Sequence, residues 1–309
     1  MDKYLSFDMG GTEIKYALVS EDFKIIEKYR FPTNFKGVDA VVNKVMKIAQ
    51  PYLSGIQGIG FSMPGTILDD ENGTILRGGS LTFMEGIAFG RIMEEKTGLP
   101  CAVENDGKSC AYGEYACGTL SGKTCGVVMA IGTAVAGGIL INGKVHRGLN
   151  HFAGEFSYLI DQPEDLGTWD AFLAFKGGVG GLQDLIIKEK NLSTETKLDG
   201  FQIFKLIHSG DKDAIKALHT FARRLGIHIL NLQSVLDPEI FAIGGGISRE
   251  KIFIDTINEE IQDLMKLCIL RPTAPIVVQS RNGNDANIIG AVFKCKEKIK
   301  NRRIMNENV

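Results

Sequence analysis

The chain has 309 residues, 44% of them apolar, and its 35 Lys and Arg against 37 Asp and Glu give a net charge of −2. This length predicts about two domains, and the composition is that of a folded globular protein, which excludes a largely disordered chain. The near-neutral charge argues against a nucleic-acid-binding surface. Glycine is over-represented, with 37 residues where about 7% of a chain is usual. Many backbone positions are therefore expected to need a positive φ or a close approach to another group.

No segment of the sequence predicts a secretion signal or a membrane span. The longest uncharged run, residues 126–141, is shorter than the ~20 residues that a membrane helix needs, and glycine and alanine interrupt it. The six cysteines include no C-x-x-C pair, and none has metal-binding spacing to a histidine. We therefore expect a cytoplasmic protein with reduced thiols, no membrane contact and no structural zinc.

Two segments share one layout, in which a strand, a turn containing Gly-Thr and a second strand form a hairpin. The four strands are expected over residues 4–7, 14–19, 127–131 and 138–141. Aligning Gly11-Thr12 with Gly132-Thr133 indicates a duplicated α/β unit.

The remainder of the chain alternates between predicted helices and strands. Helical periodicity covers residues 40–50, 89–96 and 214–236, and strands are expected over 56–61, 101–103 and 239–243. This alternation predicts an α/β fold with a largely parallel sheet. The charged run over residues 294–303 is interpreted as the solvated face of a last helix.

The turn Asp8-x-Gly10-Gly11-Thr12 is the first candidate site. Its glycines let backbone N–H groups and the Thr12 hydroxyl approach an anionic ligand, and Asp8 can hold Mg²⁺ through water. The alternative interpretation is an ordinary hairpin turn.

Asn105 and Asp106, which follow the strand expected over 101–103, are the second candidate site. Asp106 can act as a general base that takes a proton from a substrate hydroxyl, with Asn105 orienting the same substrate. The alternative is that the pair only caps the helix that follows.

Two later motifs are candidates for ligand contact. Glu155 follows a glycine-containing stretch and can accept a hydroxyl in a cleft, or it can be a solvated surface residue. Gly244, Gly245 and Gly246 follow a predicted strand. They can lie against a nucleotide, or they can form a tight turn between a strand and a helix.

Two common nucleotide-binding motifs are not present. Residues 118–124 resemble a P-loop, but Cys117 stands in place of its first glycine and a helix precedes it, so a surface loop is expected. No G-x-G-x-x-G follows a predicted strand, which argues against a Rossmann site.

Taken in chain order, these motifs resemble the ROK family (repressors, open reading frames and sugar kinases). The resemblance covers nearly the whole chain, and its specificity lies in the order and spacing of the motifs. They are Asp8-x-Gly10-Gly11-Thr12-x-x-Lys15, Ser62-Met63-Pro64-Gly65, Val103-Glu104-Asn105-Asp106, Ile131-Gly132-Thr133, Ala153-Gly154-Glu155, Pro238-Glu239-Ile240 and Ile243-Gly244-Gly245-Gly246-Ile247-Ser248.

The resemblance implies an α/β protein with the two-domain actin-like (ribonuclease H-like) ATPase fold, duplicated α/β units and a cleft between the domains. Residues 1–117 plus 290–309 would form the smaller domain, and residues 118–289 the larger one. The implied activity is phosphorylation of the 6-hydroxyl of a hexose with ATP and Mg²⁺. A homodimer is also implied, because dimers are common in the family.

The resemblance also implies roles for individual residues, with Asp106 as the catalytic base. The residues implied to bind the sugar are Gly65, Asn105, Asp106, Glu155, Tyr158 and Asp170. The residues implied to bind ATP are Asp8, Gly10, Gly11, Thr12, Lys15, Gly132, Thr133, Gly244, Gly245 and Gly246. Among these, Asp8 is also implied to hold Mg²⁺ through water.

The sequence departs from the family pattern in three places. Tyr158 stands where many members have a sugar-contacting histidine, and the zinc-binding cysteines of those members are absent here. Asp170 stands in place of the family's next sugar-binding glutamate. In the phosphate loop, Ala134 and Ala136 replace glycines, and their methyl groups can crowd a phosphate.

The sequences around Glu155 and over residues 283–292 look most like the zinc-free branch that contains bacterial β-glucoside kinases. Members of this branch phosphorylate cellobiose-type disaccharides at the non-reducing glucose, so a β-glucoside is the favoured substrate. Kinases of glucose, fructose or N-acetylmannosamine are the alternatives, and so is a catalytically silent sugar-binding regulator.

Overall fold

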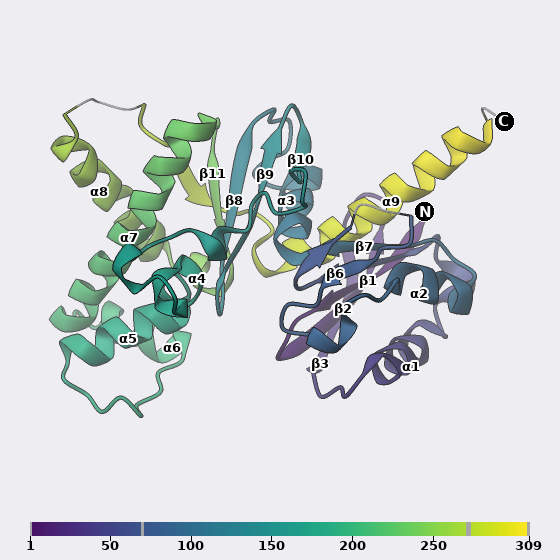
Figure 1. The fold of residues 1–309 in the computed structure, drawn as a ribbon, viewed down its shortest axis with the longest axis horizontal. Coiled ribbons are helices and arrows are strands. Elements are labelled where there is room, and N and C mark those ends of the chain that lie inside the picture. The colour runs from purple at the N-terminus through teal and green to yellow at the C-terminus, as the bar shows by residue number, and fades with distance from the viewer. Residues whose placement is uncertain (1, 69–70, 270–272, 308–309) are drawn as a thin grey trace. The chain divides into compact units, whose positions relative to one another are not determined.

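The computed structural model of the chain describes residues 2–68, 71–269 and 273–307. The chain divides into two compact units. Unit 1 comprises Met1–Ser121, Arg147–Ala153 and Asp285–Val309, and unit 2 comprises Gly122–His146 and Gly154–Asn284. Each unit is built on a five-stranded sheet against which helices pack (Figure 1).

The sheet of unit 1 has the order β3-β2-β1-β4-β7. Its strands are β1 (Lys3–Met9), β2 (Glu13–Ser20), β3 (Ile25–Pro32), β4 (Ile59–Met63) and β7 (Cys101–Asn105). β1, β2 and β3 pair antiparallel, whereas β1, β4 and β7 run parallel. The other elements are α1 (Val38–Ala49), β5 (Thr66–Ile67), β6 (Ile75–Arg77), α2 (Phe89–Thr97), α3 (Asp106–Cys117) and α9 (Ala286–Glu307).

The sheet of unit 2 repeats this arrangement in the order β10-β9-β8-β11-β12. Its strands are β8 (Gly126–Ile131), β9 (Val135–Ile141), β10 (Lys144–His146), β11 (Phe241–Gly244) and β12 (Val277–Gln279). The first three pair antiparallel, and β11 and β12 run parallel to β8. The helices are α4 (Leu173–Lys176), α5 (Val179–Glu189), α6 (Gly200–His208), α7 (Lys212–Leu236) and α8 (Lys251–Leu267). The duplication predicted from the two Gly-Thr hairpins is therefore confirmed.

The prediction of a largely parallel sheet was wrong for half of each sheet. β2 and β3, like β9 and β10, follow short turns, and strands joined by short turns pair antiparallel. The strands β3 and β10 were not predicted; no residue of β3 is fully buried, so it lacks the apolar core pattern of a central strand. The strand expected from residue 239 begins only at Phe241. Glu239 instead uses its carboxylate to accept the backbone N–H groups of Thr124 and Cys125.

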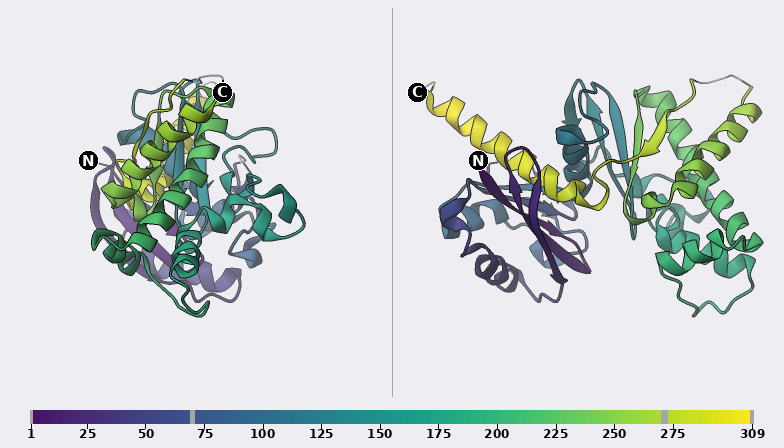
Figure 2. Two further views of the ribbon diagram at one scale, coloured as in Figure 1. Left: turned by 90° about the vertical axis from the view of Figure 1, so that its left-hand side faces the viewer. Right: turned by 180° about the vertical axis from the view of Figure 1, so that it is seen from behind.

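Side-chain alternation along β1 gives the sheet of unit 1 two different faces. Leu5, Phe7 and Met9 point into a core shared with α1 and α2. On the opposite face, the Ser6 hydroxyl donates to the Ile288 carbonyl of α9 at 2.8 Å. Around this bond α9 packs an apolar cluster against the same face, and Figure 2 lets the reader follow the helix behind the N-terminal strands.

The helices α3 and α9 of unit 1 approach each other almost backbone to backbone. A Cβ atom on Gly290 would lie 1.8 Å from the Ser109 carbonyl oxygen, and one on Gly113 would lie 2.1 Å from the Ala286 carbonyl oxygen. No larger residue fits at either place. This contact fixes the first turns of α9 against α3.

The core of unit 2 is built on the long helix α7, as its periodicity predicted. Leu218, Phe221, Leu225 and Ile229 are buried in one cluster with residues of α8 and of the sheet. In the ranges that the structure describes, no helix is long and apolar enough to cross a bilayer.

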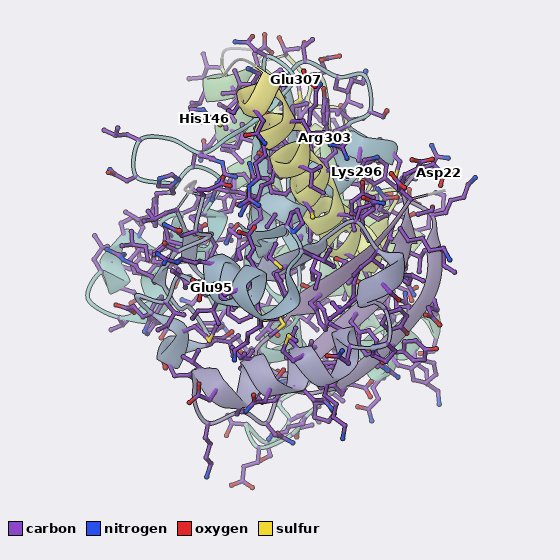
Figure 3. The ribbon with its side chains drawn as sticks, turned by 90° about the vertical axis from the view of Figure 1, so that its right-hand side faces the viewer. Asp22, Glu95, His146, Lys296, Arg303 and Glu307 are labelled. Atoms are coloured by element: carbon purple, nitrogen blue, oxygen red, sulfur yellow. The ribbon has the colours of Figure 1, made fainter. Side chains whose placement is uncertain are left out.

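The interpretation of residues 294–303 as a solvated face was wrong in part. Lys298 and Arg302 of α9 form ion pairs with Glu94 at 2.9 and 2.8 Å, and the Lys298 side chain is only 10% exposed. Lys296, which Figure 3 labels on α9 near Asp22, lies over the Phe23 ring at 4.6 Å. The charges on this helix therefore dock it onto unit 1 and do not serve solvation alone.

We expect Gly290→Ala to lower the free energy of unfolding by about 2 kcal/mol, the usual effect of overpacking a tight contact. The reason is that the new methyl group must push α9 away from Ser109. Urea unfolding followed by circular dichroism measures the effect. The control is Gly180→Ala in α5, where no atom lies within 4 Å of the added Cβ. Equal stabilities of the two variants would contradict the close packing of α3 and α9.

Candidate active site

Polar side chains form a row across the parallel strands of unit 1. Asp8 of β1 pairs in register with Ser62 of β4, and Ser62 with Glu104 of β7. All three are buried. Each lies near the carboxyl end of its strand, where ligands of open α/β sheets bind.

The Asp8 carboxylate accepts hydrogen bonds from three elements, β2, β4 and α9. Its Oδ1 accepts from the Ser62 hydroxyl and from Asn287 Nδ2, both at 3.1 Å, and its Oδ2 accepts from Lys15 Nζ at 3.3 Å. Lys15 was a predicted site residue, but Ser62 and Asn287 were not. Both lie in segments that resemble the family, Ser62 in residues 62–65 and Asn287 in residues 283–292. Nothing in the sequence singled out these two residues within their segments.

The groups at Asp8 fit a magnesium ion that is held mostly through water. Mg²⁺ in proteins is commonly bound by one or two carboxylates together with waters and substrate phosphates. Across the described ranges, no three His, Cys, Asp or Glu side chains converge in a way that would hold a metal ion by themselves. The expected absence of structural zinc remains a prediction.

Asn105 joins the second set of predicted residues in unit 1. Its Nδ2 donates to the Gly65 carbonyl at 2.8 Å and to Asp106 Oδ1 at 3.0 Å, and its Oδ1 accepts the Lys108 N–H at 2.9 Å. Asn105 is therefore the N-cap of α3, and Asp106 is the first residue of that helix. The structure thus brings Gly65, Asn105 and Asp106 together. Asn105 and Asp106 can begin the helix and also contact a substrate, so the two interpretations are compatible.

Glu104 lies in β7, directly before this turn. Its side chain is fully buried, pairs with Arg147, and accepts the Asn105 N–H at 2.8 Å. Burial raises the pKa of the Glu104 carboxyl, and the Arg147 cation acts in the opposite direction. This pair was not predicted, because Arg147 lies in a loop that carries no sequence motif.

In unit 2 the two predicted nucleotide motifs lie next to each other. The turn at Gly132 and Thr133 packs on the start of α5, where the Val179 N–H donates to the Gly132 carbonyl at 2.9 Å. Gly245 has φ 89°, and a Cβ there would lie 2.0 Å from the Ile131 carbonyl oxygen. The glycines after β11 therefore abut the end of β8, beside Gly132.

Residues 155–176 carry the remaining predicted residues on short turns. The Tyr158 N–H donates to the Glu155 carbonyl at 3.1 Å, and the Tyr158 ring lies 6.4 Å from that of Trp169, the neighbour of Asp170. The Asp170 side chain is 75% exposed and lies 3.9 Å from Lys176 Nζ. Tyr158 and Asp170 are thus placed in one part of unit 2.

A buried ion cluster anchors this segment to α7. The Asp161 carboxylate lies 3.0 Å from both Arg224 Nε and His228 Nε2, and the Asp161 side chain is 9% exposed. Burial acts to raise the pKa of the Asp161 carboxyl, but the His228 hydrogen bond and the Arg224 charge outweigh it and hold that pKa below its ordinary value. No local sequence pattern links His228 to Asp161, because the two residues are 67 positions apart along the chain.

Known proteins resemble this chain over nearly its whole length. The profile of the ROK family matches residues 4–298. A glucokinase from Halalkalibacterium halodurans is 28% identical, with 95% of each chain covered, and a beta-glucoside kinase from Klebsiella pneumoniae is 26% identical, with 94% of this chain and 95% of the relative covered. A ROK family glucokinase from Streptomyces griseus, crystallised with glucose and AMPPNP, has a similar fold. Its TM-score is 0.81 at 24% identity, with 94% of this chain and 97% of that chain covered.

The duplicated sheets and their Gly-Thr hairpins define the actin-like (ribonuclease H-like) ATPase fold, as predicted. Because the family profile spans nearly all residues, the chain belongs to the ROK family. The resemblance drawn from the sequence motifs is therefore confirmed.

We expect Asp161→Asn to lower the free energy of unfolding by about 2 kcal/mol at neutral pH, since it removes a buried charged partner of Arg224 and His228. The pKa of Asp161 is lowered by folding, so its contribution is present above the ordinary aspartate pKa and is lost as the pH falls through the folded-state value. The difference between wild type and variant should therefore narrow on acidification. Urea unfolding at a series of pH values measures it.

Asp263→Asn serves as the control, because Asp263 pairs with Lys266 on the surface and its side chain is 59% exposed. Surface pairs contribute roughly 0–1 kcal/mol. A wild-type advantage over Asp161→Asn that stays constant down to acid pH would contradict the anchoring role of the Asp161 charge.

Proposed function

We propose that this ROK family chain, an ATP-dependent carbohydrate kinase, transfers the γ-phosphoryl group of ATP to the 6-hydroxyl of a hexose or of a cellobiose-type β-glucoside. The single observation that carries the proposal is the joined set Gly65, Asn105 and Asp106 at the carboxyl ends of the parallel strands, beside the row that contains Asp8. An ATP-dependent enzyme of this kind is expected to work in the cytoplasm, and a homodimer also remains a prediction.

Asp106 is the proposed general base. Its Oδ1 accepts the Gly107 N–H at 2.8 Å and Asn105 Nδ2 at 3.0 Å, which fixes the orientation of the carboxylate. Asp106 is also the first residue of α3, and the start of a helix favours an anionic side chain. The sugar oxygen then bonds to the γ-phosphorus while the bond to ADP breaks, and the hydroxyl proton passes to Asp106.

A comparison of glycines in the two units supports a phosphate-binding role for the Gly132 turn of unit 2. At Gly10, Gly11, Gly65 and Gly245, a Cβ would come within 2.7 Å of another atom, so close packing already favours glycine there whether or not a ligand binds. At Gly132 an added Cβ would lie 3.9 Å from its nearest neighbour, the Ala134 carbonyl oxygen, and at Gly246 nothing lies within 4 Å of it. A ligand that approaches the backbone gives a reason for glycine at these two places. The Thr133 hydroxyl would supply a further donor.

The proposed metal contact is at Asp8. When bound, Mg²⁺ offsets the charge that develops on the transferring phosphoryl oxygens. Ser62 and Asn287 would hold the Asp8 carboxylate in place for that contact. Gly10, Gly11, Thr12 and Lys15, on the same hairpin, are the proposed partners of ATP in unit 1.

The proposed sugar contacts are Gly65, Asn105 and Asp106 in unit 1 and Glu155, Tyr158 and Asp170 in unit 2. The relative named as a beta-glucoside kinase supports a β-glucoside as the substrate, and the relative named as a glucokinase supports free glucose.

A catalytically silent regulator is the second candidate function, because Ala134 and Ala136 replace glycines in the phosphate loop. ADP formation in a coupled assay with glucose, fructose, N-acetylmannosamine and cellobiose separates enzyme from regulator.

We expect Asp106→Asn to lower turnover by about 10²–10⁴-fold while sugar binding persists, because the amide cannot take the hydroxyl proton. The coupled ADP assay measures turnover, and calorimetry measures sugar affinity. Asp39→Asn is the matched control, since Asp39 occupies the first turn of α1 in the same unit. Undiminished turnover in Asp106→Asn would remove Asp106 from the mechanism.

We expect Gly132→Ala to raise the KM for ATP by roughly tenfold, which corresponds to about 1.4 kcal/mol, with little change in thermal stability. The reason is that the fold leaves room for the methyl group and a bound phosphate would not. The control is Gly200→Ala at the start of α6, where nothing lies within 4 Å of the added Cβ. An unchanged KM for ATP, or a loss of stability with no effect on ATP, would contradict phosphate binding at this turn.

A further inference from the structure

Four aromatic rings gather on the surface of unit 2, and we name them the aromatic platform: Tyr158, Trp169, Phe172 and Phe175. Tyr158, Trp169 and Phe172 form a triangle with ring centroids 6.1–6.4 Å apart, and Phe175 joins it 6.2 Å from Trp169. Tyr158 is 42% exposed, Trp169 60% and Phe175 53%. A contiguous exposed aromatic surface of this kind marks a place where a ligand or partner binds.

The platform is held in shape before any ligand arrives. The Phe172 N–H donates to the Trp169 carbonyl, and the Asp161 N–H donates to the Ala171 carbonyl at 2.8 Å. Asp161 is itself bound to His228 and Arg224 of α7. The rings therefore belong to an anchored segment, which reduces the ordering entropy that binding would require.

Charged groups border the aromatic rings. The exposed Asp170 carboxylate follows Trp169 in sequence, and Lys176 Nζ lies 3.9 Å from it and 3.5 Å from Asp165. Aromatic faces attract the C–H groups on one side of a sugar ring, while carboxylate and ammonium groups bind its hydroxyls. This combination of rings and charged groups is suited to a carbohydrate, which presents both C–H groups and hydroxyls.

We propose that the aromatic platform binds the second ring, or aglycone, of a β-glucoside whose other sugar is phosphorylated. The inference rests on the proposed function, which assigns Tyr158 and Asp170 to the sugar and places Glu155 three residues before Tyr158. Together the four rings cover more area than one pyranose, so a monosaccharide would leave part of them bare. Trp169, Phe172 and Phe175 thus become specificity-determining residues for a substituted sugar.

The experiment uses Trp169 as its own reporter, because it is the only tryptophan of the chain. Its fluorescence is followed in the intact protein during titration with glucose, methyl β-glucoside and cellobiose. We expect a shift to shorter wavelength with cellobiose and little change with glucose or methyl β-glucoside, since only a second ring would remove water from the indole. Equal responses to glucose and cellobiose, or no response to cellobiose, would overturn the inference.

Kinetics of variants give a second readout. Trp169→Ala should raise the KM for cellobiose about tenfold and leave the KM for glucose and both kcat values nearly unchanged, as expected for loss of one stacked ring. Trp169→Phe should recover most of the affinity for cellobiose. Phe201→Ala, which removes a 79% exposed ring on α6 outside the platform, is the matched control. An equal rise in KM for glucose and cellobiose would overturn the inference.

The outcomes separate the platform from the kinase. If no sugar yields ADP while cellobiose still shifts the Trp169 emission, the proposed function fails and the platform stands. If glucose is phosphorylated and cellobiose neither reacts nor shifts the emission, the kinase stands and the platform fails. A second copy of the chain is the competing occupant. Trp169→Ala that dissociates an oligomer in light scattering, with sugar preference unchanged, would overturn the inference in favour of that contact.

Discussion

The buried Asp8 carboxylate is the constraint on which the rest of unit 1 depends. An ionised group removed from water must be matched by donors, and here these come from β2, β4 and α9. To supply Asn287, the first turn of α9 must reach the end of the sheet, and the close contact at Gly113 and Gly290 allows that approach. One carboxylate thus couples sheet register, helix packing and the candidate metal site.

The duplicated unit shows how one architecture was used in two ways. With Gly11 aligned to Gly132, Asp8 corresponds to Met129, and the polar row of unit 1 corresponds to Met129, Ile243 and Gln279 in unit 2. Met129 and Ile243 belong to the apolar core. At these matched positions, only unit 1 carries charged side chains. Unit 2 instead brings its Gly132 turn, the start of α5 and the glycines after β11 together.

Residues 155–176 show a different solution to the same problem of holding functional groups in place. The segment has little regular secondary structure, so its own backbone cannot fix Tyr158, Trp169 or Asp170. A buried ion cluster at Asp161 ties it to α7, which is part of the rigid core. Loops that carry function are commonly positioned by a rigid scaffold in this way. The aromatic platform therefore depends on the Asp161 ion cluster for its position.

Local sequence determined much of this protein by itself. Apolar periodicity identified α7 and the hairpin strands, the two Gly-Thr turns revealed the duplication, and the order of short motifs identified the ROK family. These features depend on neighbouring residues, whose spacing is fixed by the geometry of helices and strands. Only the tertiary structure decided that Asn287 meets Asp8 across 279 residues and that His228 meets Asp161 across 67. Such contacts depend on which faces the folded sheets and helices present to each other, and no local pattern records that.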